Sequence, residues 1–218
     1  MTDAFSLRRP RRLPVFFLID TSREMGGTFQ VTLQEGLEVV KRLLLDSPIA
    51  ARHVYLAGIT FGEKTVAGRL RPVDAFEVAP WQAQGVCNLG SALVSLAEAL
   101  TYDLLVTRPD RPGDYTPLVF PIIGDHPADA WEDALPGLAT FSDNRHPLIV
   151  ALVTRPELAR DMRKLSNHVL LLSPAEAQSI TSYFFWVAHV IATICADCER
   201  GATTVDFPAF PYGVVMPR

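Results

Sequence analysis

Short apolar runs alternate with amphipathic segments along this chain. Five continuous runs are typical of buried strands, and they cover residues 15–20, 53–61, 117–123, 148–153 and 167–172. A shorter run at 65–70 follows the tight connection Gly62-Glu63-Lys64, so we expect it to pair antiparallel with 53–61 at a sheet edge. Helical spacing of apolar residues predicts helices between the runs. The alternation indicates a doubly wound α/β fold, with a mostly parallel six-stranded sheet, one antiparallel edge strand and helices on both faces.

Capping residues and prolines predict where the helices begin and end. Thr28 should cap a helix that runs to about Leu45, with Pro48 after its end, and the next long helix should cover residues 89–106. Asp129 should cap a short helix through Trp131, and Thr154 a helix with Pro156 in its first turn. The sequence Ser173-Pro174-Ala175-Glu176 reads as a capping box for a last helical region that ends before Gly201.

One domain accounts for most of the 218 residues, because the chain is 49% hydrophobic and its elements alternate throughout. We expect a basic N-terminal arm at 1–12, the domain at 13–201 and an extended tail rich in proline and aromatic residues at 202–218. Within the arm, Arg8, Arg9, Arg11 and Arg12 form a solvated cluster or a salt-bridging edge.

Charge, apolar runs and cysteine count argue against several classes of partner. The net charge of −4 gives no reason to expect nucleic acid. No signal peptide is recognisable, and the longest apolar run, from Tyr183 to Ala196, is shorter than a membrane span. Three cysteines are an odd count, which disfavours a disulfide framework. We therefore expect a cytoplasmic protein with no membrane partner.

The loop after the first apolar run carries the most distinctive chemistry. Asp20, Ser22 and Glu24 offer oxygen atoms at every second position, directly after a buried strand. Ligands of open α/β sheets gather at the carboxyl ends of strands, and hard cations such as Mg²⁺ prefer oxygen ligands. This loop is therefore a candidate metal or partner site.

Three loops together resemble a known family. They are Asp20-Thr21-Ser22-Arg23-Glu24-Met25, Gly85-Val86-Cys87-Asn88-Leu89-Gly90-Ser91-Ala92-Leu93 and Phe120-Pro121-Ile122-Ile123-Gly124-Asp125-His126-Pro127-Ala128-Asp129-Ala130-Trp131. The set resembles the von Willebrand factor A (vWA) domain, a Rossmann-like fold. Phrases such as Arg12-Leu13-Pro14-Val15 and Phe185-Trp186-Val187 resemble its bacterial, tellurium-resistance-associated TerY-type branch.

The resemblance implies a metal-ion-dependent adhesion site, or MIDAS, of which only part is present. Asp20 and Ser22 match the first two ligand positions of the family motif. Glu24 stands in place of a serine, Cys87 in place of a threonine and Gly124 in place of an aspartate, with Asp125 one residue later. A thiol is a poor ligand for Mg²⁺. The motif is therefore expected to be degenerate.

Three carboxylates at one point, from Asp20, Glu24 and Asp125, would repel one another, so their negative charge would need compensation. A cation would supply it, and so would protonation of one carboxylate, an arginine such as Arg23, or backbone amides at a helix start. The residues alone leave these alternatives open.

Two further motifs have modest explanations. Cys195 and Cys198 form a C-x-x-C on a predicted helix, where core packing accounts for them better than a redox pair or half a zinc site. A nucleophile built from Cys87 and His126 is conceivable across neighbouring loops, but no orienting motif accompanies it.

We expect a non-enzymatic binding or adaptor module without a cofactor. Its partner-binding loops would contain Asp20, Ser22, Arg23, Glu24, Cys87, Asn88, Gly124, Asp125 and His126. The resemblance implies a protein partner, such as a Ser/Thr kinase or phosphatase, in a stress or tellurite-resistance system. The alternative is a module that retains Mg²⁺ through Asp20, Ser22 and Glu24, with Asp125 nearby.

Overall fold

A computed structural model describes residues 10–77, 80–141, 146–202 and 207–217. The elements in chain order are β1 (Leu13–Asp20), η1 (Arg23–Met25), α1 (Thr28–Leu45), α2 (Pro48–His53), β2 (Val54–Phe61), β3 (Thr65–Ala67), β4 (Arg71–Pro72), η2 (Val73–Ala75), α3 (Leu89–Tyr102), β5 (Leu118–Ile123), η3 (Trp131–Ala134), α4 (Leu135–Ala139), β6 (Leu148–Val153), α5 (Pro156–Met162), β7 (His168–Leu172), α6 (Ala177–Glu199) and β8 (Val214–Val215).

Within the described residues, one sheet of eight strands has the order β3-β2-β1-β5-β6-β7-β8, with β4 also paired to β2. Strands β2, β1, β5, β6 and β7 are parallel, while β3, β4 and β8 pair antiparallel at the two edges. The doubly wound, mostly parallel fold is thus confirmed. The predicted count of six strands is wrong, because β4 and β8 are two-residue strands with no apolar alternation long enough to be recognised.

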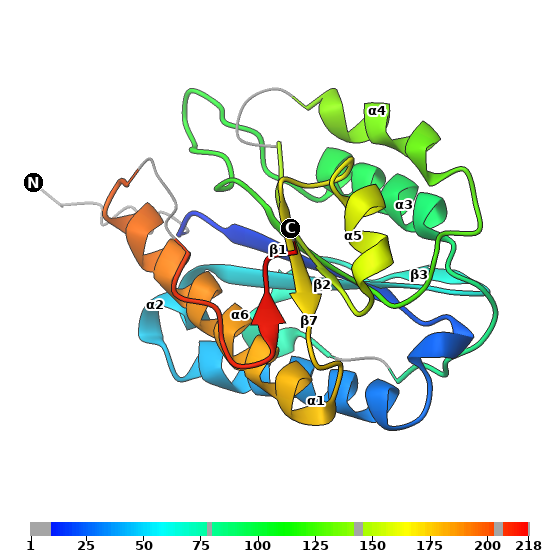
Figure 1. Ribbon diagram of the computed structural model, residues 1–218. Coiled ribbons are helices and arrows are strands. Elements are labelled where there is room, and N and C mark those ends of the chain that lie inside the picture. The colour runs from blue at the N-terminus through cyan, green and yellow to red at the C-terminus, as the bar shows by residue number, and fades with distance from the viewer. Residues whose placement is uncertain (1–9, 78–79, 142–145, 203–206, 218) are drawn as a thin grey trace, which may run out of the picture.

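Helices cover both faces of the sheet, with α1, α2 and α6 on one side and α3, α4 and α5 on the other (Figure 1). Alternate residues of β1 therefore enter two separate cores, Phe17 facing α1 and α6, and Phe16 facing α3. Burial on both faces explains why this strand reads as a continuous apolar run.

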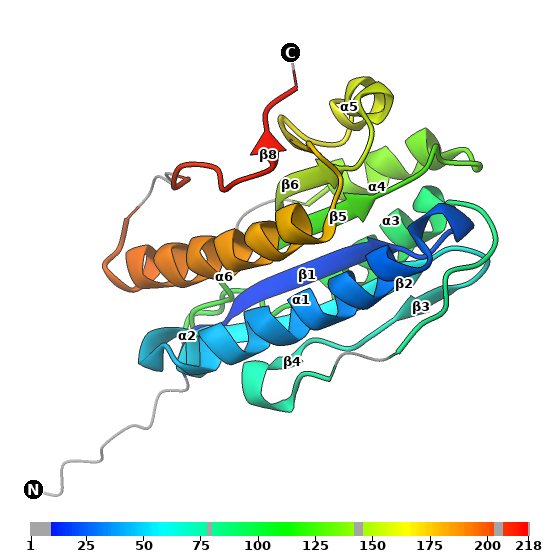
Figure 2. The same ribbon diagram turned by 60° about the horizontal axis from the view of Figure 1, so that its bottom comes forward.

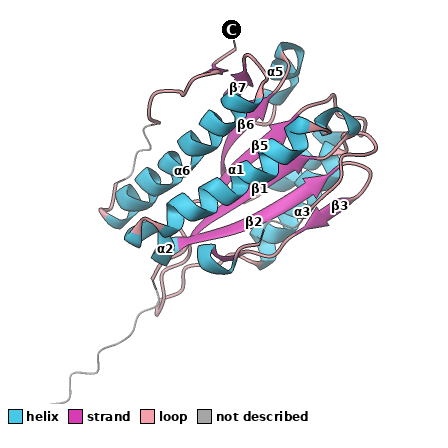
Figure 3. Ribbon diagram, turned by 90° about the horizontal axis from the view of Figure 1, so that it is seen from below, coloured by secondary structure: helices cyan, strands magenta, loops and turns pink. Residues whose placement is uncertain are grey.

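Helices α1 and α6 lie side by side across one face (Figures 2 and 3). Gly36 of α1 permits this approach, because a Cβ atom there would meet the Phe184 ring at 2.0 Å. By length and composition α6 could cross a membrane, because the helix extends at both ends beyond the apolar run from Tyr183 to Ala196. However, 61% of its most apolar stretch is buried inside the fold, as in the core helix of a globular domain.

Some predicted helix ends differ from the structure. α1 covers the predicted segment, but its N-cap is Gly27 rather than Thr28. Pro48 begins the short helix α2, and α3 ends at Tyr102 rather than near residue 106. The predicted capping box before α6 is absent, because its N-cap is Glu176 and no side chain bonds there. Arg155, not Thr154, precedes α5, again without a side-chain cap.

The first and last described segments of the chain both contact the domain. Arg12 binds the buried carboxylate of Asp114 through two nitrogens, at 2.8 and 2.5 Å, so the end of the predicted arm is a salt-bridging edge. Arg8 and Arg9 lie outside the described residues. The C-terminal tail docks on α6, where Trp186 donates to the carbonyl of Pro208 at 3.2 Å and its ring packs against Phe207 and Phe210.

Candidate functional site

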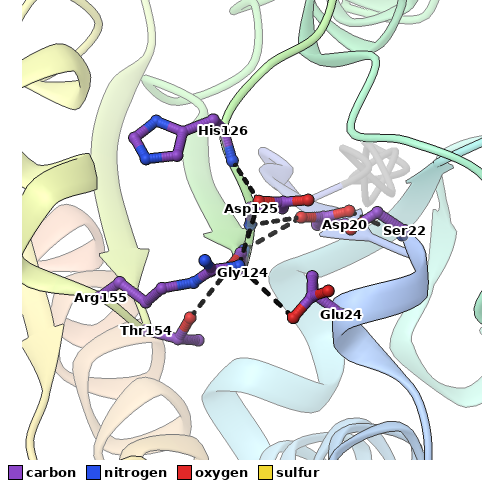
Figure 4. Close-up of polar contacts among 8 residues, drawn as sticks. All are labelled: Asp20, Ser22, Glu24, Gly124, Asp125, His126, Thr154 and Arg155. Carbon is purple, nitrogen blue, oxygen red and sulfur yellow. Dashed lines mark hydrogen bonds and ion pairs between the residues drawn. The ribbon is translucent and has the colours of Figure 1, made fainter.

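Asp20 lies buried at the carboxyl end of β1 and joins two of the three loops. Its Oδ1 accepts from the Ser22 amide at 2.8 Å, and its Oδ2 accepts from the amides of Gly124 and Asp125 at 3.0 and 3.1 Å (Figure 4). Burial raises the pKa of Asp20, while these amides oppose the shift. The carboxylate therefore holds the first and third loops together through backbone donors.

An arginine compensates the other two carboxylates, and it is Arg155 rather than Arg23. Arg155 follows β6, and its Nη2 lies 3.0 Å from Oδ1 of Asp125 and 3.7 Å from Oε2 of Glu24. Its Nε also donates to the carbonyl of Gly124 at 3.0 Å (Figure 4). Arg23 is exposed, and its side chain forms no hydrogen bond or ion pair within the described part of the chain.

Arg155 belongs to the site although the sequence alone did not indicate it. It is the N-cap of α5, two residues after the carboxyl end of β6, which neighbours β5 in the sheet. The rule that ligands gather at these strand ends applied to it as well as to Asp20. The strand order, which places β6 beside β5, was the information needed to find it.

The second loop is fastened to the third by backbone and side-chain contacts. The carbonyl of Cys87 accepts from the amide of Ala128 at 2.8 Å, and the Asn88 side chain donates to the carbonyl of Gly62 at 2.7 Å. Asp129 accepts from the amides of Gly90 and Ser91 at 3.1 and 3.2 Å, so it caps α3 rather than the short helix after it. The three loops thus form one connected edge.

Gly124 is buried against Met25. A Cβ atom at position 124 would lie 1.9 Å from the sulfur of Met25, which is itself only 1% exposed. A side chain at position 124 would therefore require Met25 to move, and the carboxylate that the family motif carries there has no equivalent in this position.

Cys87 and His126 do not form a nucleophilic pair in this geometry. Cys87 is fully buried, and this burial, followed by the nearby charge of Asp20, raises the pKa of its thiol far above the ordinary value of 9.0. The imidazole of His126 points away from Asp20 and Ser22, while its backbone N–H donates to Asp125 at 2.8 Å (Figure 4). No hydrogen bond between Cys87 and His126 occurs in the described structure.

The carboxylate oxygens of these loops are bound by groups of the chain itself rather than grouped around one point. Both carboxylate oxygens of Asp20 accept backbone N–H groups, and Glu24 and Asp125 face the positive charge of Arg155. Within residues 10–77, 80–141, 146–202 and 207–217, no group of three or more His, Cys, Asp or Glu side chains could hold a metal ion. The hydroxyl of Ser22 is the exception, since it is buried and has no hydrogen-bond partner among the described residues.

Sequence comparisons find no protein-family profile and no curated protein that matches this chain. Solved structures do match its fold. A von Willebrand factor type A structure from Catenulispora acidiphila superposes with a TM-score of 0.55 at 14% identity, covering 84% of this chain and 43% of that one. The fold is that of a vWA domain.

Other structures share this vWA fold. The pilus adhesin SpaC from Lactobacillus rhamnosus GG has a TM-score of 0.63 at 9% identity, over 86% of this chain. Proximal thread matrix protein 1 from the mussel byssus has a TM-score of 0.61 at 13% identity, over 85% of this chain. A further structure of the mussel protein has a zinc-occupied MIDAS motif. The chain spans 31% of the SpaC chain and 49% of the mussel one, so both proteins extend well beyond the shared domain.

Proposed function

We propose that this chain is a non-enzymatic binding module that recognises a protein partner through the loops at the carboxyl edge of its sheet. The observation that carries the proposal is the single connected edge that Asp20 builds by accepting amides from two loops. A vWA fold shared with adhesins and a matrix protein supports a role in binding.

The exposed groups of this edge suit a partner surface that carries both positively and negatively charged side chains. Arg23, Glu24 and His126 are exposed, and Arg155 and Asp125 are partly so. Because Asp20 and Cys87 are buried, they act as support for the loops rather than as contacts. Asn88 is half-buried and holds the second loop in place through Gly62.

The nature of the partner rests on the sequence resemblance. The TerY-type branch implies a bacterial, cytoplasmic adaptor in a stress or tellurite-resistance system, with a Ser/Thr kinase or phosphatase as its partner. The net charge of −4 and the burial of α6 are the reasons to propose neither nucleic acid nor a membrane as the target.

A second candidate function keeps a divalent metal, with Asp20, Ser22 and Glu24 as ligands and Asp125 nearby. The unpartnered hydroxyl of Ser22 favours it, because a buried hydroxyl without a hydrogen bond has a free-energy cost that a cation would relieve. In that case a metal would also have to displace the ion pair between Glu24 and Arg155. We therefore propose the metal-free module first.

A capture experiment tests the loops. The double variant Glu24→Ala/His126→Ala removes two exposed groups from the proposed surface, and Arg108→Ala/Asp110→Ala removes two from the loop at the opposite end of the sheet. A partner should be retained by the parent protein and by the opposite-end variant but lost with the loop variant. Retention by all three would reject this surface.

Metal titration separates the two candidate functions. A ligand that binds only the folded state raises thermal stability by mass action. The metal-free module predicts an unchanged melting temperature in millimolar Mg²⁺ or Mn²⁺. A rise that Ser22→Ala abolishes would instead establish the metal-dependent module.

A further inference from the structure

A cavity of about 630 Å³ lies on the α1 face of the sheet, at the edge formed by β2, β3 and β4. The short strands β3 and β4 both pair with the outer edge of β2, on the side away from β1 (Figure 2). The cavity exists because Gly58 occupies the middle of β2, where a Cβ atom would meet nothing within 4 Å. It lies apart from the exposed groups of the strand-end loops described above.

Apolar side chains form the interior of the cavity. Ile19 of β1 and Leu37 of α1 are each 2% exposed, and buried Phe76 and half-buried Trp81 add two aromatic side chains to the lining. A volume of this size falls in the range of about 300–1,000 Å³ that small-molecule sites occupy. One protein side chain would leave most of it empty.

The outer wall is held in place by two side chains of α1. Gln30 donates to the carbonyl of Trp81 at 2.5 Å and accepts from the amide of Ala83 at 3.0 Å. Lys41 donates to the carbonyl of Phe76 at 2.5 Å. Both aromatic residues are thus anchored through their backbones, which makes the cavity a preformed feature of the fold.

The rim of the cavity carries an excess of positive charge. Arg69 and Arg71 are both exposed lining residues, and neither side chain has a hydrogen bond or ion pair within the described structure. Glu77 is the one carboxylate among the residues that line the cavity. Two arginines without partners beside an apolar interior are complementary to a molecule with an apolar body and an acidic group.

We propose that this cavity binds a small organic anion, with an apolar or aromatic body over Gly58 and a carboxylate, sulfonate or phosphate at Arg69 and Arg71. The anchored aromatic wall supplies contact area at little cost in ordering, and the rim supplies the charge preference. This site is separate from protein recognition at the strand ends, so either can exist without the other.

Fluorescence titration with anilinonaphthalene sulfonate, an aromatic anion of suitable size, tests the proposal on the full-length protein. Its neutral parent, phenylnaphthylamine, lacks the sulfonate and reports the apolar contribution alone. We expect saturable binding of the anion at one site. Absence of saturable binding would overturn the proposal.

Gly58→Val narrows the cavity at its floor on β2, because the added atoms enter open space and valine suits a strand. We expect this variant to bind both probes about tenfold or more weakly, while its melting temperature is unchanged or higher. Unchanged binding of the anion in this variant would place the probe elsewhere and overturn the proposal.

The arginines are tested independently of cavity filling. Arg69→Gln/Arg71→Gln should weaken binding of the anionic probe by about fivefold, as expected for two solvent-exposed charges. Binding of the neutral probe should be nearly unaffected. Arg108→Gln/Arg111→Gln makes the same change in net charge in the exposed loop before β5, at residues that do not line the cavity, and should alter neither probe. An equal effect of the first pair on both probes would contradict the preference for an anion.

Discussion

Nη2 of Arg155 lies 3.0 Å from Oδ1 of Asp125, across the ends of the adjacent strands β5 and β6. The same guanidinium reaches Glu24, which follows β1. One side chain of the protein thus supplies positive charge at the sheet edge where these carboxylates gather. This arrangement explains how Glu24 and Asp125 can lie together at the edge without a bound cation.

Replacing Arg155 should have a measurable but modest effect on stability. Its side chain is 35% exposed and that of Asp125 is 31% exposed, so solvent screens the pair. We expect Arg155→Ala to lower the free energy of unfolding by about 1 kcal/mol, measured by urea denaturation. Arg160→Ala, an exposed position on α5, is the matched control and should cost less. Equal losses in the two variants would show that the ion pair contributes nothing.

Replacing Arg12 should lower the free energy of unfolding more than replacing Arg155. Asp114 is only 3% exposed and also accepts from the amide of Leu105 at 2.8 Å, so removal of the guanidinium leaves a buried carboxylate without its counter-charge. We expect Arg12→Ala to lower the free energy of unfolding by about 3 kcal/mol. Arg111→Ala, in the neighbouring exposed loop, provides the comparison. A loss below that of Arg155→Ala would contradict the role of burial.

The three thiols should differ in their reactivity toward an alkylating reagent. Burial raises the pKa of Cys195 to about 12 and that of Cys87 still further, while Cys198, also raised, is only partly buried. Because the thiolate is the reactive form, labelling of Cys87 and Cys195 in the native protein should remain slow between pH 7 and 9. Mass spectrometry should find Cys198 modified first, and all three after denaturation. Rapid labelling of Cys87 would restore it as a candidate nucleophile.

The contact between Gly124 and Met25 can be measured by a double-mutant cycle. Gly124→Ala alone should destabilise the protein by about 1–3 kcal/mol, since the new methyl group overlaps the Met25 sulfur. In a Met25→Ala background the same change should cost much less, because the truncated side chain leaves room. Additive losses would mean that the cost at position 124 arises from another neighbour.

The sequence predicted the fold well because each buried strand is continuous in its apolar residues. Residues 148–153 and the helix from Thr28 to Leu45 cover the predicted segments. The short strands β4 and β8 could not be predicted, because two residues carry no periodicity and their pairing depends on distant segments.

The candidate site was predicted in part. The three loops do converge, as the positions of Asp20 and Gly124 after buried strands indicated. The identity of the compensating arginine was wrong, because Arg155 lies 30 residues from Asp125 along the chain and only the order of strands brings them together. The role of Asp129 was misassigned for a similar reason, since its partners Gly90 and Ser91 belong to another loop.

The tight contact between Gly124 and Met25 also limits the evolutionary paths open to this domain. An aspartate at position 124 requires that Met25 be repacked or replaced, and replacement by a smaller residue removes a buried side chain and lowers stability on its own. This packing cost at position 124 comes in addition to the changes that the family's full set of metal ligands would need at positions 24 and 87. Selection acting on such a chain would refine what its loop surfaces recognise more readily than it would restore coordination chemistry.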